Sequence, residues 1–209
     1  MKTSSFAAIL GFGAVSFLSA CGGQAIEPPA APTAPAEPSA VAEVPKAPEA
    51  PAVAAPAPKA EPRTLEVKLE AKSGSKLAGK ATLSETEGGV QVVLSVEGVT
   101  PGGDHGAHVH EKGDCSAPDG ASAGGHFNPS GHEHALPATA KRHLGDLGNL
   151  AVGKDGKGSL TITIPGANLK AGDANSFAGK SIIVHAKADD GGQPTGNAGG
   201  RIGCGVIGS

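Results

Sequence analysis

The chain has 209 residues, with 33 glycines, 17 prolines, five phenylalanines and no tryptophan or tyrosine. This glycine-rich, aromatic-poor composition favours a turn-rich all-β fold over a helical one. The formal net charge is −3 and no basic block occurs, which disfavours nucleic acid as a partner. From Arg63 onward, the chain has 14 basic and 15 acidic residues. A domain so close to neutral can attract an anion only through the local placement of its charges.

The N-terminal residues 1–20 have the outline of a secretory signal peptide. They begin with one lysine, run apolar from Phe6 to Leu18, and lead into the sequence LSAC, which ends at Cys21. The apolar run is too short to cross about 30 Å of hydrocarbon. Because LSAC resembles a bacterial lipobox, we expect Cys21 to be a lipid anchor and the membrane contact to be made through it alone. The protein would then be exported and lipid-anchored in the bacterial cell envelope, either periplasmic or on the outer membrane. An ordinary secreted protein with an incidental Cys21 is the alternative.

Residues 21–62 follow as a linker in which proline and alanine alternate with scattered glutamates. No apolar pattern there could bury a core, so we expect a disordered tether, extended in part by its prolines. The folded domain is predicted to span residues 63–209.

Short alternating runs begin at residue 64. Leu65, Val67 and Leu69, for example, alternate with charged residues, as in a half-buried strand. Eight such runs occur, at residues 64–72, 76–85, 90–99, 105–111, 147–153, 159–165, 180–187 and 202–208. They predict an antiparallel sandwich or flattened barrel of eight strands. The two long interruptions, 112–146 and 188–201, are where we expect function.

The first interruption contains a candidate metal loop. Its histidines and aspartate follow the pattern H-x7-H-x8-H-x2-D, formed by His126, His134, His143 and Asp146. Glycines and prolines occur throughout the stretch and disfavour helix or strand, so something other than regular backbone hydrogen bonding must order it. Three imidazoles and one carboxylate suit Zn²⁺ in a closed, structural site.

Three further histidines fall on predicted strands. His108 and His110 flank Val109, and since side chains alternate along a strand, both imidazoles point to the same face. His185 ends another strand. Together with one histidine shared from the loop, these three would form an all-nitrogen set that suits tetragonal Cu(II). All eight histidines lie between residues 105 and 185, which disfavours reading them as ordinary polar surface.

The motifs GAHVHEKGDC, GGHFNP, VHAKADD and GNAGGRIGCGVIG accompany the metal loop. In this order and spacing, from about residue 64 to residue 209, they closely resemble the copper,zinc superoxide dismutase family. The resemblance implies a Greek-key β-sandwich, in agreement with the eight predicted strands.

Carried over residue by residue, the resemblance also implies a site. It places one copper on His108, His110, His126 and His185, and one zinc on His126, His134, His143 and Asp146, with His126 bridging the two ions. Asp189 would orient His108 and His134 from behind, and Arg201 would guide the anion, so that Arg201 and His126 are the catalytic residues. Cys115 and Cys204 would form a disulfide. His105 is expected to be structural, and His132 exposed.

The implied activity is the dismutation of superoxide to dioxygen and hydrogen peroxide, which would protect the cell envelope from external superoxide. The alternative is a non-catalytic envelope protein that stores or buffers copper and zinc on the same scaffold. A homodimer is compatible with the sequence, which does not determine the oligomeric state. One departure stands out: the stretch from Asp189 to Arg201 is shorter than in the eukaryotic branch of the family, so electrostatic steering would depend largely on Arg201.

Overall fold

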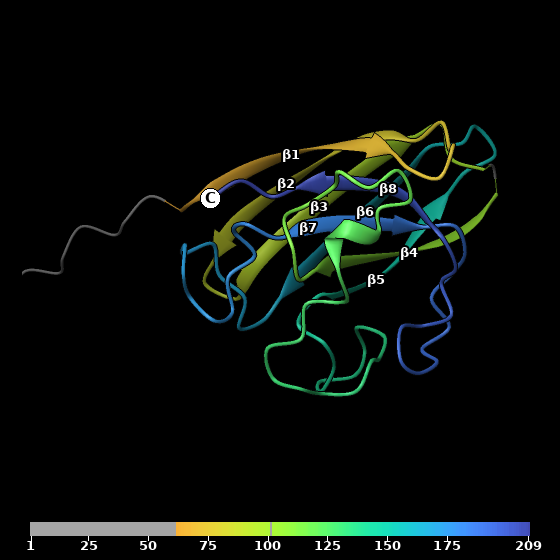
Figure 1. Cartoon of the computed structure of the whole chain (residues 1–209). Helices are drawn as coiled ribbons and strands as arrows, with labels where there is room; N and C mark the ends of the chain where they lie inside the picture. The colour runs from red at the N-terminus through yellow and green to blue at the C-terminus, as the bar shows by residue number, and fades with distance from the viewer. Residues whose placement is uncertain (1–61, 101) are drawn as a thin grey trace, which may run out of the picture. The chain divides into compact units, whose positions relative to one another are not determined.

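The computed structural model describes residues 62–100 and 102–209 (Figure 1). The predicted signal peptide, the predicted lipid anchor Cys21 and almost all of the predicted linker lie outside these ranges. Within them, no helix is long and apolar enough to cross a membrane.

Eight antiparallel strands close into one barrel, which confirms the predicted all-β class and strand count. The strands are β1 (Thr64–Ala71), β2 (Ala78–Thr86), β3 (Gly89–Glu97), β4 (Gly103–His110), β5 (Asp146–Val152), β6 (Gly158–Ile164), β7 (Ser181–His185) and β8 (Arg201–Val206). The one helical segment among the described residues is the short 3-10 turn η1 (Ala121–Ala123).

The order of strands around the barrel is β1-β2-β3-β6-β5-β4-β7-β8, which is consistent with a Greek key. Most consecutive strands pair with each other. The exceptions include β3, which pairs with β6, so that Val92 lies opposite Ile162. In the same way β4 pairs with β7, where His108 lies opposite Ile183. These two long-range pairings bring the histidine strand β4 beside the strand that ends in His185.

The core lies inside the barrel and is aliphatic. It is lined by the inward residues of each alternating strand, such as Val67 and Leu69 on β1 and Val90, Val92 and Leu94 on β3. Each of these side chains is almost fully shielded from solvent. Burial of this kind is worth about 1.5–3 kcal/mol per large aliphatic side chain, so the barrel supplies a rigid frame for whatever lies on its outside.

Strand β4 is buried on both faces. Ala107 and Val109 point into the barrel core, whereas His108 and His110 point outward and are still only 0% and 1% exposed. They are covered by the two long connections, β4–β5 (residues 111–145) and β7–β8 (residues 186–200). In Figure 1 the segment with η1 lies in front of the barrel, and much of both connections extends below it. The two predicted functional loops therefore cover the outer face of β4.

Candidate metal centre

The β4–β5 connection is held against the barrel by backbone hydrogen bonds near its middle and at its C-terminal end. Phe127 N donates to Val109 O at 2.8 Å, and Val109 N donates to Gly145 O at 2.8 Å. Gly145 lies so close to the strand that a Cβ there would come within 2.3 Å of Val109 O, so this position requires glycine. His126, just before Phe127, is thereby brought opposite His110 in an isolated β-bridge.

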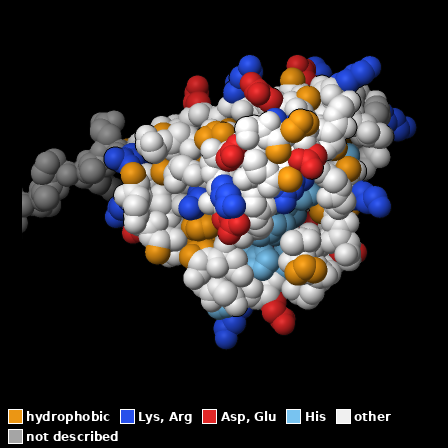
Figure 2. Space-filling model, in the orientation of Figure 1, with side chains coloured by type: hydrophobic (Ala, Val, Ile, Leu, Met, Phe, Trp, Pro, Cys, Tyr) orange, Lys and Arg blue, Asp and Glu red, His pale blue; other side chains and the backbone are white. Residues whose placement is uncertain are grey.

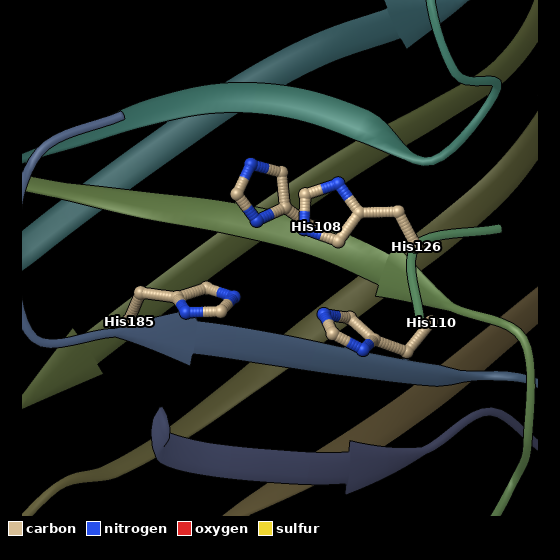
Figure 3. Close-up of side chains that lie close together, drawn as sticks. All are labelled: His108, His110, His126 and His185. Carbon is tan, nitrogen blue, oxygen red and sulfur yellow. The ribbon is translucent and has the colours of Figure 1, made fainter. Parts of the chain in front are cut away.

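Four histidines converge on one point outside β4 and β7 (Figure 3). They are His108, His110, His126 and His185, and one nitrogen of each lies within 4.8 Å of the others. The facing atoms are His108 Nδ1 and the Nε2 atoms of the other three. None of these four buried nitrogens has a hydrogen-bond partner among the described residues. Because buried polar atoms are normally paired, four unpaired nitrogens aimed at one point form a site that a metal ion would complete.

The opposite nitrogens of these rings are occupied, which sets their orientation. His110 Nδ1 lies 2.9 Å from Gly124 O, and His185 Nδ1 lies 3.1 Å from Gly199 O. Each ring therefore donates an N–H to a carbonyl and presents a lone pair on its other nitrogen.

Burial keeps these imidazoles neutral. It lowers the pKa of His110 to about 2 and that of His185 to about 3, in each case against a smaller opposing effect of the carbonyl hydrogen bond. Burial likewise lowers the pKa of His108 to about 4, although its hydrogen bond to Asp189 opposes the shift. At neutral pH all three are therefore free-base donors, as metal ligation requires.

A second donor set surrounds the carboxylate of Asp146. The Nδ1 atoms of His126 and His134 each lie 3.0 Å from Asp146 Oδ1, and His143 Nδ1 lies 3.3 Å from the same oxygen. His126 Nδ1 and His143 Nδ1 are also 3.3 Å apart. The other oxygen, Oδ2, accepts backbone N–H groups from Ala135 and His143, which leaves Oδ1 facing the three imidazoles.

These spacings fit a tetrahedral zinc ion. A tetrahedron with arms of about 2.0–2.1 Å has edges of roughly 3.3–3.4 Å. Four of the six separations among these donors, 3.0 to 3.3 Å, are close to that value. The pKa of Asp146 is below its usual range: burial acts to raise it, but the hydrogen bond from His126 and its other contacts prevail, so the group is a carboxylate.

His126 belongs to both sets, because its two ring nitrogens face opposite ways. Nδ1 points to the Asp146 set and Nε2 to the four-histidine set. The His126 ring stacks on the His108 ring with centroids 3.9 Å apart. The two donor sets are therefore joined through a single imidazole.

Asp189 also connects the two donor sets, through ring nitrogens that face away from the donor sites. Its Oδ2 accepts from His108 Nε2 and its Oδ1 from His134 Nε2, both at 2.9 Å. Although burial acts to raise the pKa of this carboxyl group, the two histidine hydrogen bonds and that from Gly191 hold it well below its usual range. A buried carboxylate placed in this way fixes the tautomer and orientation of both rings.

Arg201 lies beside the four-histidine set. Its Nη1 donates to Gly120 O at 2.6 Å and its Nη2 to Gly124 O at 2.7 Å. Gly124 O is also the acceptor for His110, so the guanidinium and that ring share one carbonyl. Figure 2 shows histidine side chains reaching the surface as a narrow pale-blue band near the middle of this face, with charged side chains around it.

A disulfide joins Cys115 to Cys204, as the sequence resemblance implied. Cys204 is buried with Ala123 and Ile183 on the outer side of the barrel. The bond thus ties the start of the β4–β5 connection to β8, three residues after Arg201.

Every histidine expected in the site lies in one of the two sets, and the other two lie where expected. His105 is buried and its Nδ1 bonds to His185 O at 2.8 Å, which supports the strand end at His185. His132 is exposed.

Two supporting residues were missed by sequence reasoning. Asn149 exchanges two 2.8 Å hydrogen bonds with the main chain of Asp189. Gln193 does the same for His134, accepting from its N–H at 3.1 Å and donating to its carbonyl at 2.7 Å. For Asn149 a signal existed, since a polar amide interrupts the otherwise apolar run LGNLAV; for Gln193 we find none.

Comparison with known proteins points to one family. The family model described as copper/zinc superoxide dismutase matches residues 77–207. A protein named superoxide dismutase [Cu-Zn] 2 from Brassica juncea is 45% identical over 131 residues, covering 59% of this chain and 84% of the relative. A protein of the same name from Aquifex aeolicus (strain VF5) is 40% identical over 133 residues, covering 62% and 78%.

Among solved structures, a double mutant of an SOD-like protein from Bacillus subtilis aligns with a TM-score of 0.62 and 39% identity. The alignment covers 69% of this chain and 97% of that one. The chain belongs to the copper/zinc superoxide dismutase family. It is an oxidoreductase of that family, and its cofactors are copper and zinc.

Proposed function

We propose that the protein converts two superoxide anions and two protons into dioxygen and hydrogen peroxide. The observation that carries this proposal is His126, whose single ring offers one nitrogen to each of two adjacent donor sets. Membership of the copper/zinc superoxide dismutase family and the unpaired nitrogens of the four-histidine set support it.

Each donor set has its own assignment in this proposal. Copper is held by His108, His110, His126 and His185, and zinc by His126, His134, His143 and Asp146. When bound, copper supplies one-electron exchange with superoxide, whereas zinc, which has no redox chemistry, holds the bridging ring.

The residues of the chain then provide charge, orientation and a proton. Arg201 uses two N–H groups on Gly120 and Gly124, and a guanidinium has five, so three donors remain for a small anion. Its permanent charge attracts that anion toward the four histidines. Nε2 of His126, when it does not hold copper, would be the atom that carries a proton for transfer to the reduced product. Asp189 keeps His108 and His134 in the tautomers that face the metals.

A store or buffer of copper and zinc is the competing function. Such a protein needs the ligands, but it gains nothing from an arginine held beside them by two hydrogen bonds. The arginine therefore favours turnover over storage.

Metal analysis combined with a superoxide-decay assay, with and without added copper, tests the proposal. We expect about one copper and one zinc per chain and catalytic decay that depends on copper. Full loading with both metals but no catalytic decay would establish the store instead.

We further propose that the enzyme acts in the bacterial cell envelope, anchored by lipid at Cys21, and removes superoxide that arrives from outside. The support is the N-terminal sequence alone, with its apolar run and the LSAC ending. Labelled palmitate should enter the protein expressed in a bacterium and be lost in Cys21→Ala. Equal labelling of both proteins would contradict the anchor.

A further inference from the structure

The turn between β1 and β2 contains a residue that the turn itself does not explain. Ser73 has φ = 53° and Gly74 φ = 71°, so both occupy the left-handed region. Glycine adopts that conformation without cost and asparagine with little, whereas serine is uncommon there. Its side chain supplies a reason, because Ser73 Oγ donates to the backbone carbonyl of Arg201 at 2.8 Å.

Further hydrogen bonds join this turn to the arginine strand. Lys72 N donates to Ile202 O at 2.9 Å, and Ser75 Oγ donates to the same carbonyl at 2.6 Å. Together with the Ser73 hydroxyl, these contacts hold the main chain of Arg201 and of its neighbour.

The same turn also holds the loop that receives the guanidinium. Lys72 Nζ donates to Cys115 O, and Ser73 N donates to Pro118 O at 2.8 Å. The carbonyls that accept from Arg201, those of Gly120 and Gly124, lie a few residues further along this loop.

Gly120 lies beside the side-chain stems of both Lys72 and Arg201. A Cβ at this position would come within 3.4 Å of Arg201 Cβ and Cδ and within 3.7 Å of Lys72 Cγ. The stems of Lys72 and Arg201 therefore lie close to the same glycine. The disulfide does not replace the Ser73 bond, because it acts at Cys115 and Cys204, whereas the Ser73 hydroxyl acts at Arg201 itself.

We propose that Ser73 and Lys72 are positioning residues that hold Arg201 for a small monoanion such as superoxide or azide. Ser73 fixes the main chain of the arginine, and Lys72 fixes the loop that carries the acceptors of its side chain. Since a misplacement of about 1 Å is costly for a binding group, both contacts affect anion binding without touching the anion. The inference rests on the proposed role of Arg201 as the anion guide.

The decisive variant is Ser73→Gly, because it should preserve the stability of the turn while it weakens anion binding. Glycine suits the positive φ, so the melting temperature of the protein should stay level or rise. Loss of the hydroxyl should nevertheless raise the Kd for azide in the copper- and zinc-loaded protein by about fivefold, as for one neutral hydrogen bond. Azide binding is followed by its optical charge-transfer band at fixed ionic strength.

Lys72→Met should weaken azide binding to a similar extent, and Lys72→Arg should restore most of the affinity. Lys76→Met is the matched control: it removes an equal charge from an exposed lysine in the same turn. A second readout needs no copper. Arg63, Arg142 and Arg201 are the chain's three arginines, so guanidinium rotation can be followed by NMR in the zinc-loaded, copper-free protein. Rotation of the Arg201 group should quicken in Ser73→Gly and stay unchanged in Lys76→Met.

The outcomes separate the two proposals. If Arg201→Ala leaves the azide Kd unchanged, the guiding role of Arg201 fails and the present inference fails with it. If Arg201→Ala weakens azide binding but Ser73→Gly and Lys72→Met match Lys76→Met, the turn has no positioning role and Arg201 keeps its own.

Discussion

Replacing Asp189 by asparagine tests whether one carboxylate organises both metal sites. Its two oxygens accept N–H groups from His108 and His134, each at 2.9 Å. The isosteric amide keeps one acceptor and turns an NH₂ group toward the other ring. One buried N–H would then face a donor, which costs about 1–3 kcal/mol. Loss of such a supporting contact lowers metal affinity by roughly 10–100-fold.

The expected result is that Asp189→Asn raises the Kd for zinc about 10–100-fold, measured by competition with a fluorescent chelator at pH 7. Zinc is the informative metal because His134 takes part in that set alone. Asp190→Asn is the matched control, since that carboxylate is adjacent but exposed. Equal zinc affinities in the two variants would refute the reasoning.

Three more predictions follow from the site. Arg201→Ala should lower the dismutation rate by about tenfold or more at low salt and flatten its dependence on ionic strength; an unchanged rate at low salt would count against the steering role. His126→Ala should impair retention of both metals, whereas Asp146→Ala should lose zinc while copper still binds, as metal analysis of the dialysed proteins would reveal. In the metal-free protein, His110 and His185 have pKa values of about 2 and about 3, below the unfolded value of about 6.5. The unfolded chain therefore binds more protons below pH 6.5, and the free energy of unfolding should fall as pH drops from 6.5 toward 4, by at most about 1.4 kcal/mol per pH unit for each ring. Urea midpoints that stay constant from pH 7 to pH 5 would contradict this.

The strands were predictable because their alternation is local. Every predicted run became a strand, and the boundaries differ by only a few residues for physical reasons. The run predicted at 90–99, for instance, ends at Glu97, because Gly98 has φ = 70° and leaves the extended conformation. The long-range pairings of β3 with β6 and of β4 with β7 are not local, and neither pairing was predicted; the family resemblance implied only a Greek-key sandwich.

Much of the two metal sets was also predictable from the sequence, because one set follows a spaced histidine and aspartate pattern in a loop and the other has its histidines on strands. The choice of His126 as the shared ligand came from the family resemblance. Of the supporting contacts, only those of Asp189 were expected, through the family resemblance; those of Asn149 and Gln193 were missed. Asn149 meets Asp189 across 40 residues and Gln193 meets His134 across 59, and both use backbone groups that carry no sequence signature. The carbonyl of Gly124, which accepts from His110 and Arg201, belongs to the same category.

The Gly124 carbonyl, which accepts from both His110 and Arg201, limits which substitutions the chain can accept during evolution. Gly124 has φ = 75°, a conformation that residues with a side chain rarely adopt, so a substitution at this position would strain the backbone that carries the carbonyl. Any shift of the peptide moves the acceptor of a proposed copper ligand and that of the proposed anion guide together. Selection therefore cannot adjust the ring of His110 and the guanidinium of Arg201 one at a time through this loop: a substitution tolerated by one must be tolerated by the other, and compensating changes should arise in pairs.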